Sequence, residues 1–142
     1  MAYSSSFSKS ILVVIFISDK IRQGQFEFLS TKVISEILNI PKPTLVKILN
    51  SLSQADLIET KEGKQGGIRL LKQPSEITIL DILESVERGK KLFNTSFDIL
   101  AKGQRPDNAQ KSVSSILQKA ENEMKKSLSE KTIEEILIEM GK

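Results

Sequence analysis

The feature that most constrains this chain is a pair of short segments with apolar stripes and a tight break between them. The first begins after Ser30, whose hydroxyl suits a helix N-cap, and ends before the break at 39–41. The second begins at Lys42, and its apolar residues recur at the helical spacing i, i+3, i+4, i+7: Leu45, Ile48, Leu49 and Leu52. Pro41 and Pro43 fit only at the very start of such a helix, where a backbone N–H has no intrahelical partner. The pattern predicts a helix-turn-helix.

A hairpin of two short strands follows the second helix directly. Residues 57–61 and 68–71 have the β-branched and apolar character of strands, and residues 62–67 between them form a glycine-rich turn. A hairpin in this position distinguishes the winged form of the motif. The sequence therefore predicts a mainly α fold with a small β-hairpin wing, that is, an α+β winged helix-turn-helix.

Helical segments lie on both sides of this unit. Residues 7–22 carry a β-branched run that suits a buried strand by propensity, whereas their length and polar flanks suit a helix that is apolar nearly all round. Such a helix must be buried on more than one face, by the core of the domain and by a partner chain as a further candidate. Thr78 with Asp81 at the third helical position predicts a capping box, and Gly89 suits the end of that helix.

The last third of the chain predicts a long amphipathic helix. Residues 90–106 have weak periodicity and form a connector, after which Asp107 or Asn108 can cap the helix. The helix has a single apolar stripe, which it cannot bury alone, so the stripe must lie on the domain or on a partner. The stripe consists of Val113, Ile116, Leu117, Ala120, Met124 and Leu128.

A short helix completes the predicted organisation. Thr132 and Glu135 have the spacing of a further capping box, which opens this last helix. We therefore divide the chain into a winged helix-turn-helix domain at 1–89, a connector at 90–106, and a dimerisation helix with a C-terminal helix at 107–142.

The absence of cysteine and histidine from all 142 residues excludes several kinds of chemistry. Disulfides, thiolate nucleophiles, imidazole bases and the usual soft-metal ligands are ruled out, and no phosphate-binding glycine loop is present. We therefore expect no enzyme activity and no cofactor. No run approaches the ~20 apolar residues of a membrane span. The apolar run 11–17 is followed by charges instead of a signal-peptide cleavage site, so we expect a cytoplasmic protein without a membrane partner.

Basic residues gather in the first half of the chain. Residues 1–75 hold ten Lys and Arg against six Asp and Glu, whereas residues 76–142 hold eleven against twelve. The net charge of +3 is mild, but a basic half favours contact with a polyanion. Double-stranded DNA is therefore the expected partner of the winged unit.

Three places in the winged unit supply candidate DNA contacts. The second helix of the motif enters the major groove, a helix N-terminus suits a phosphate, and a basic turn can enter the minor groove. A solvated helix face and an ordinary hairpin turn would carry similar residues, and it is their combination that favours DNA. The candidates are Ser30, Thr31 and Lys32 at the first helix, Lys42, Thr44, Lys47 and Asn50 in the second, and Lys61, Lys64, Gln65, Gly66 and Arg69 in the wing.

The order of elements and three motifs resemble the Rrf2 family of bacterial winged-helix regulators. The motifs are LSQADLI at 52–58, KQGGIRL in the wing at 64–70, and PSEITILDILESVE at 74–87. The resemblance runs from about Phe7 to Gly89 and, more loosely, to the C-terminus. It implies homodimers that bind a pseudo-palindromic operator with the helix at 42–54 in the major groove and the wing nearby.

The resemblance also implies where the dimer interface lies. Family members join largely through the long helix, here about 108–128, and the first helix helps to cover the partner. These implied interface residues are Ile11, Ile15, Val113, Ile116, Leu117, Ala120 and Met124.

The chain departs from the family at the connector. Cluster-binding members carry three cysteines there, whereas this connector contains Phe93, Asn94, Thr95, Ser96 and Phe97 and no cysteine. A cysteine-ligated iron–sulfur cluster is therefore excluded for a single chain of this sequence. The sequence leaves three alternatives open for the signal that the protein senses: a small-molecule effector, a partner protein, or no signal at all.

The sequence thus predicts a sequence-specific DNA-binding transcriptional regulator, a repressor, that acts as a homodimer without a cluster. The alternative is a winged-helix module that docks proteins and does not read DNA. The low net charge and the two prolines that open the reading helix leave room for that alternative.

Overall fold

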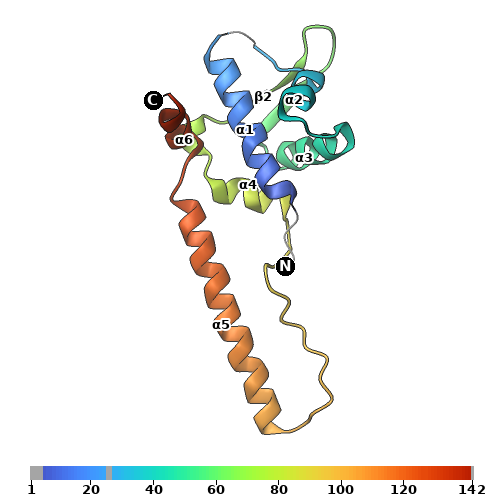
Figure 1. Ribbon diagram of the computed structural model, residues 1–142, viewed down its shortest axis with the longest axis vertical. Coiled ribbons are helices and arrows are strands. Elements are labelled where there is room, and N and C mark those ends of the chain that lie inside the picture. Colours follow the sequence, from blue (N-terminus) through green and yellow to red (C-terminus); the bar gives the residue numbers. More distant parts are fainter. Residues whose placement is uncertain (1–4, 25–26, 142) are drawn as a thin grey trace.

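The computed structural model describes residues 5–24 and 27–141. In this part of the chain a winged helical unit holds every element but one, and the remaining helix projects from it as an arm (Figure 1). The predicted fold class, mainly α with a two-stranded antiparallel hairpin, is confirmed. The elements are α1 (Ser6–Arg22), α2 (Thr31–Leu38), α3 (Lys42–Gln54), β1 (Ile58–Lys61), β2 (Gly67–Leu70), the 3-10 turn η1 (Pro74–Glu76), α4 (Ile79–Val86), α5 (Gln104–Ser129) and α6 (Ile133–Met140).

Helix α1 is the centre of the winged unit, and the helical alternative for its β-branched run is the one observed. It contacts α2, α4, α6 and β2, so it is covered on several faces (Figure 1). Val13, Val14 and Ile17 are completely buried between these elements. This burial compensates for the low helix propensity of β-branched residues.

Helices α2 and α3 form the helix-turn-helix, and local polar bonds fix the turn between them. The predicted cap is present, since the Val33 amide donates to Ser30 Oγ at 3.1 Å. Asn39 ends α2 in the left-handed conformation, and Ser35 Oγ donates to the Ile40 carbonyl at 2.7 Å. The predicted stripe of α3 is buried in the common core.

The wing is a hairpin with an additional partner at its edge. Strands β1 and β2 pair antiparallel with Ile58 opposite Leu70 and Lys61 opposite Gly67. Leu29, just before α2, forms an isolated bridge to Ile68 through hydrogen bonds of 2.9 and 2.7 Å in the two directions. The wing is thereby bonded to the start of the helix-turn-helix, a link that the sequence pattern did not predict.

Two tertiary links attach α6 to the winged unit. The Ile79 amide donates to the Lys131 carbonyl at 3.0 Å, and the Ile133 amide donates to the Ile77 carbonyl at 2.9 Å. The predicted capping box of α4 is complete, with bonds from the Thr78 amide to the Asp81 carboxylate and from the Asp81 amide to the Thr78 hydroxyl.

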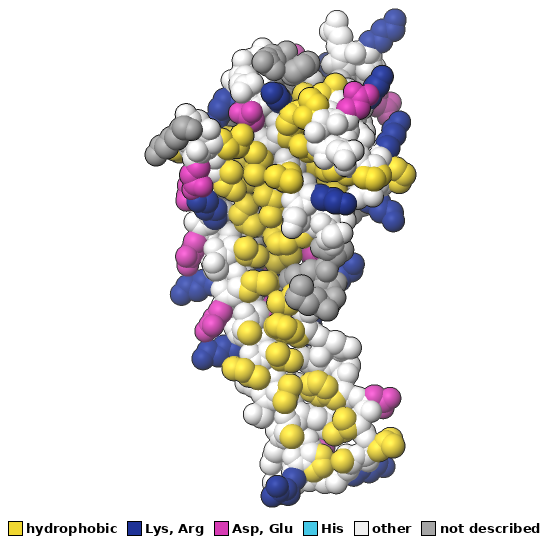
Figure 2. Space-filling view, in the orientation of Figure 1, with side chains coloured by type: hydrophobic (Ala, Val, Ile, Leu, Met, Phe, Trp, Pro, Cys, Tyr) yellow, Lys and Arg dark blue, Asp and Glu magenta, His cyan; other side chains and the backbone are white. Residues whose placement is uncertain are grey.

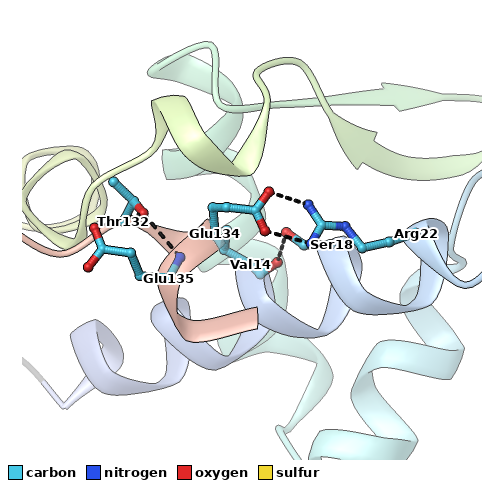
Figure 3. A network of polar contacts seen from close by, with 6 residues as sticks. All are labelled: Val14, Ser18, Arg22, Thr132, Glu134 and Glu135. Atoms are coloured by element: carbon cyan, nitrogen blue, oxygen red, sulfur yellow. Dashed lines mark hydrogen bonds and ion pairs between the residues drawn. The ribbon is translucent and has the colours of Figure 1, made fainter. Parts of the chain in front are cut away.

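Helix α6 has a different cap. The Glu135 amide donates to Thr132 Oγ1 at 3.1 Å, and the Thr132 hydroxyl in turn donates to the Glu135 carboxylate (Figure 3). The other bond of the predicted capping box, from the Thr132 amide to the Glu135 carboxylate, is not formed between these two described residues.

An ion pair across α1 and α6 strengthens this packing. Both terminal nitrogens of Arg22 donate to the carboxylate of Glu134 at 2.7 Å (Figure 3). The hydrogen bonds from Arg22, followed by its positive charge, hold the pKa of Glu134 below its usual value. The two residues are 112 positions apart, so no local pattern could have indicated their contact.

Helix α5 begins earlier than expected. The prediction that Asp107 or Asn108 caps it is wrong, because the helix starts at Gln104 with Gly103 as its N-cap. Pro106 lies in the first turn, where the missing N–H costs nothing, and Asp107 lies there too, where the helix dipole favours an acid. The expectation that Pro106 belongs to the connector is therefore wrong, because Pro106 lies in the first turn of α5.

The arm touches the winged unit mainly through α4. Lys125 lies 3.6 Å from Glu84 of α4 and 3.7 Å from the buried Glu121 of its own helix. The carboxylate of Glu121 also accepts a hydrogen bond from the Leu92 amide in the connector. In the described residues of the arm Glu121 alone is buried, so most of this 26-residue helix is exposed. No helix among the described residues combines the length and apolarity that a bilayer crossing requires.

Candidate nucleic-acid interface

Helix α3 presents a polar face on the side opposite its buried stripe. Of the residues predicted to contact the groove, Lys42, Lys47 and Asn50 are exposed and Thr44 is half-buried. Val46 is also 41% exposed, although it is apolar. Val46 was not among the predicted contacts, although its position outside the buried stripe indicates that it is exposed. An apolar side chain on a reading helix can contact a thymine methyl group.

The start of α2 places three further candidates near the bridge to the wing. Ser30 Oγ is engaged by the Val33 amide, so its hydroxyl oxygen serves the cap in this structure. Thr31 is half-buried and Lys32 is exposed. The first amides of α2 and the Lys32 ammonium are therefore the groups at this end that suit a phosphate.

The tip of the wing carries exposed polar side chains on a closely packed turn. Lys61, Lys64 and Gln65 are exposed, whereas Gly66 is half-buried and its amide donates to the Gly63 carbonyl at 3.1 Å. A side chain at Gly66 would overlap the Lys61 carbonyl. Gly66 is thus required by the shape of the turn itself.

Arg69 occupies a different environment from the other wing cations. Its guanidinium is paired with Glu59 directly across the strands, lies 3.9 Å from Glu27, and stacks over the ring of Phe28 at 4.7 Å. Lys61 also lies over this ring, at 5.4 Å from its centre. Phe28 therefore brings two wing cations together. It was not among the predicted site residues, because this contact joins separate segments of the chain.

The remaining basic candidates have no carboxylate partner among the described residues. Lys32, Lys42, Lys47 and Lys64 form none of the ion pairs found in this part of the chain. An exposed lysine without an internal partner retains its full charge for an external anion. These four lysines come from α2, α3 and the wing, so the free positive charge is shared by all three.

The arm and α1 expose apolar residues on a continuous face. Figure 2 shows hydrophobic side chains running from the winged unit down the length of the arm. Leu12, Val113 and Ile116 are exposed, Ile116 at 59%. Of the predicted interface residues, Ile11, Ile15, Leu117 and Met124 are half-buried and Ala120 is exposed.

The fold and this site define a winged helix-turn-helix protein with a long helical arm. The Rrf2 family model, described as an iron-dependent transcriptional regulator, matches residues 3–139. The chain therefore belongs to the Rrf2 family, which is a family of transcriptional regulators and not of enzymes. The resemblance drawn from the sequence motifs is confirmed.

Individual relatives agree with this assignment. The chain is 36% identical over 70 residues to the HTH-type transcriptional regulator NsrR of Shouchella clausii, a match that covers 49% of this chain and 47% of that protein. It thus spans about half the length of the curated relatives that it matches.

Two solved structures share the fold at low sequence identity. The structure of IscR from T. potens superposes with a TM-score of 0.71 at 18% identity and covers 99% of this chain and 88% of that one. CymR, the global cysteine regulator of B. subtilis, gives 0.66 at 19% identity, with 96% and 95% covered. These similarities extend over the arm as well as the winged unit.

The residues present do not fit the iron that the family description implies. The chain offers neither thiolate nor imidazole, the ligands that protein-bound iron clusters use. Among the described residues, no group of three or more carboxylates is placed to hold a metal ion.

Proposed function

We propose that this protein is a sequence-specific DNA-binding regulator that acts as a homodimer on a pseudo-palindromic operator, without an iron–sulfur cluster. The observation that carries the proposal is the set of four exposed lysines on α2, α3 and the wing that form no ion pair with a described carboxylate. The winged unit at 1–89 supplies the DNA contacts, and the arm within 107–142 supplies dimerisation. This activity belongs in the cytoplasm, where bacterial DNA lies.

Helix α3 is the proposed reader of the major groove. Lys47 and Asn50 project from the side opposite the buried stripe and reach base edges, while Lys42 at the helix start contacts phosphate. Ser30, Thr31 and Lys32 contact the phosphate backbone beside it. Thr44, half-buried at the edge of this face, completes the proposed helix contacts.

The wing is proposed to reach the neighbouring minor groove with its turn. Lys64 and Gln65 lie at the exposed tip, and Lys61 lies at its base. Gly66 holds the turn in shape, and Arg69 contacts the phosphate backbone when it exchanges Glu59 for DNA. Arg69 therefore contacts DNA only after it releases Glu59, whereas Lys64 has no described carboxylate to release.

The exposed apolar face supports the homodimer. The arm contains 26 residues and is therefore roughly 39 Å long, at 1.5 Å per residue. A second copy crossing it would cover Val113, Ile116 and Ala120, and would reach Ile11 and Ile15 of α1. Two α3 helices related by a two-fold axis would then read half-sites about 34 Å apart or a multiple of that spacing. A dimer bound across a promoter would exclude polymerase, so we propose repression.

The test is selection of bound DNA fragments from a genomic library, followed by fluorescence anisotropy with the enriched sequence. We expect a pseudo-palindrome and an affinity that falls steeply with salt. Lys47→Met should weaken binding to this site by about 1–3 kcal/mol if Lys47 reads a base. Lys119→Met, on the exposed polar side of the arm, is the matched control and should bind normally. Selection that yields no enriched sequence at low salt would refute DNA recognition.

Exposed apolar residues on the helix-turn-helix favour a second candidate, a module that docks proteins. Ile37 of α2 is 60% exposed and Val46 of α3 is 41% exposed. A protein-binding surface would use these residues as its apolar centre. Ile37→Asp distinguishes the two, because it should leave DNA affinity nearly intact under the first proposal and abolish partner binding under the second.

A further inference from the structure

A cleft of about 260 Å³ lies where the end of α1 meets the second strand of the wing. This volume is small for a ligand site, so it fits a small molecule only. Three of its lining residues are cationic, and no acidic residue is among the described residues that line it. The lining consists of Ser18, Ile21, Arg22, Arg69, Leu70, Lys72, Gln73 and Pro74.

The three cations of the cleft differ in how far they are already neutralised. Arg22 is bound by Glu134 through both terminal nitrogens, and Arg69 is paired with Glu59. No described carboxylate lies within ion-pair distance of the Lys72 ammonium, although Lys72 also borders a neighbouring cleft that contains Asp81 and Glu84. Arg69 also lies 3.9 Å from Glu27, so Lys72 is the one cation of the described lining that has no carboxylate within ion-pair distance.

Apolar side chains make up most of the remainder of the cleft. Ile21, Leu70 and Pro74 contribute hydrocarbon surface, and the Ser18 hydroxyl already donates its proton to the Val14 carbonyl at 2.7 Å (Figure 3). A ligand that satisfies these groups needs one negative group for the cations and a short apolar body. Burying the body against the three apolar residues adds the favourable transfer of its surface from water.

We infer that this cleft is a binding site for a small monocarboxylate with an apolar body, recognised by Lys72 with the remaining N–H groups of Arg22 and Arg69. The site connects to the wing, because Arg69 is the residue that exchanges Glu59 for DNA in the function proposed above. A carboxylate bound to Arg69 lowers the positive charge that the wing presents to DNA. The ligand thus weakens operator binding, an inference that rests on the proposed function for its regulatory part alone.

The binding part is tested on the full chain without DNA. Hexanoate is the probe, hexanamide is its neutral counterpart, and both are titrated into ¹⁵N-labelled protein while the amide resonances of Leu70, Lys72 and Gln73 are followed. We expect saturable shifts with hexanoate, with a dissociation constant on the order of 0.1–1 mM for so small a ligand. Hexanamide and inorganic phosphate should give no saturable shifts, because hexanamide lacks the negative charge and phosphate lacks the apolar body.

Two variants separate recognition from a general charge effect. Lys72→Met removes the unneutralised cation and keeps the length of the side chain, so it should weaken hexanoate binding at least about fivefold. Lys102→Met removes an exposed lysine from the connector, which leads to the end of α5 farthest from the winged unit (Figure 1), and this variant should bind hexanoate normally. Absence of saturable shifts at these amides, or equal shifts with hexanamide, would overturn the assignment of the site.

The regulatory part uses the selected operator at constant ionic strength, with sodium chloride replacing sodium hexanoate. Saturating hexanoate should weaken operator binding severalfold in the wild type and leave it unchanged in Lys72→Met. If hexanoate binds but does not change the affinity for the operator, the proposed regulation is refuted and the assignment of the binding site stands. If the protein binds no DNA at all, the proposed function fails while the titration still decides the site.

Discussion

Gly67 at the start of the second wing strand provides the sharpest test of how the wing is held. Its φ is +145°, and a Cβ added there would lie 2.5 Å from the Leu29 carbonyl oxygen and 2.7 Å from the Leu29 carbonyl carbon. Both neighbours are backbone atoms, which cannot rotate away as a side chain can. Gly67→Ala therefore forces the wing and the Leu29 segment apart.

The expected cost has two parts. The backbone conformation is one that L-residues rarely adopt, which costs about 1–3 kcal/mol. Separation of the segments also breaks the two hydrogen bonds between Leu29 and Ile68, of 2.9 and 2.7 Å, at about 1 kcal/mol each. Together these give a loss of about 3–5 kcal/mol, a large part of the roughly 5–15 kcal/mol by which proteins of this kind are stable.

Gly63→Ala is the matched control in the same turn. Gly63 has a φ of +105°, but a Cβ there would meet nothing within 4 Å. Its cost is therefore backbone strain alone, about 1–3 kcal/mol. Urea unfolding monitored by circular dichroism measures both variants, and hydrogen exchange of the Leu29 and Ile68 amides reports the bridge directly. Equal stability losses in the two variants, with the bridge amides still protected, would refute the reasoning.

Three other expectations follow from the caps, the ion pair and the arm. Thr78→Ala should lower the free energy of unfolding by about 1 kcal/mol in urea titration, because α4 loses its capping hydroxyl. The Arg22–Glu134 pair stabilises the fold at neutral pH, and this contribution is lost as pH falls through the lowered pKa of Glu134. Glu134→Gln should therefore be less stable at pH 7 and converge with the wild type in acid. Ile116→Glu should raise the dimer dissociation constant more than tenfold in analytical ultracentrifugation.

Much of the winged unit could be predicted because its determinants are local. The N-caps at Ser30 and Thr78 depend on residues within three positions, and the stripe of α3 depends on helical spacing. The glycine-rich turn between the strands is equally local. The caps and the stripe were predicted at the residues where the structure places them, and the predicted turn at 62–67 is one residue too long, because Gly67 begins β2.

The failures concern contacts between distant segments and one ambiguous proline. The Leu29–Ile68 bridge joins the wing to the start of α2, and the Arg22–Glu134 pair joins α1 to α6. Neither contact is indicated by the periodicity or the composition of the sequence. Proline is compatible both with a connector and with the first turn of a helix. The sequence alone therefore did not distinguish these two places for Pro106.

In the candidate site, the composition indicates which residues are basic, but only the fold shows which of them are paired with a carboxylate. A count of basic residues treats Lys64 and Arg69 alike, because both lie in the wing. The fold separates them, since Arg69 is held by Glu59 and Phe28 whereas no described carboxylate pairs with Lys64. Under the proposed function, Lys64 therefore meets DNA without losing a contact to a described carboxylate, while Arg69 must give one up. In that proposal, the difference makes Arg69 the wing residue through which a second ligand changes DNA binding.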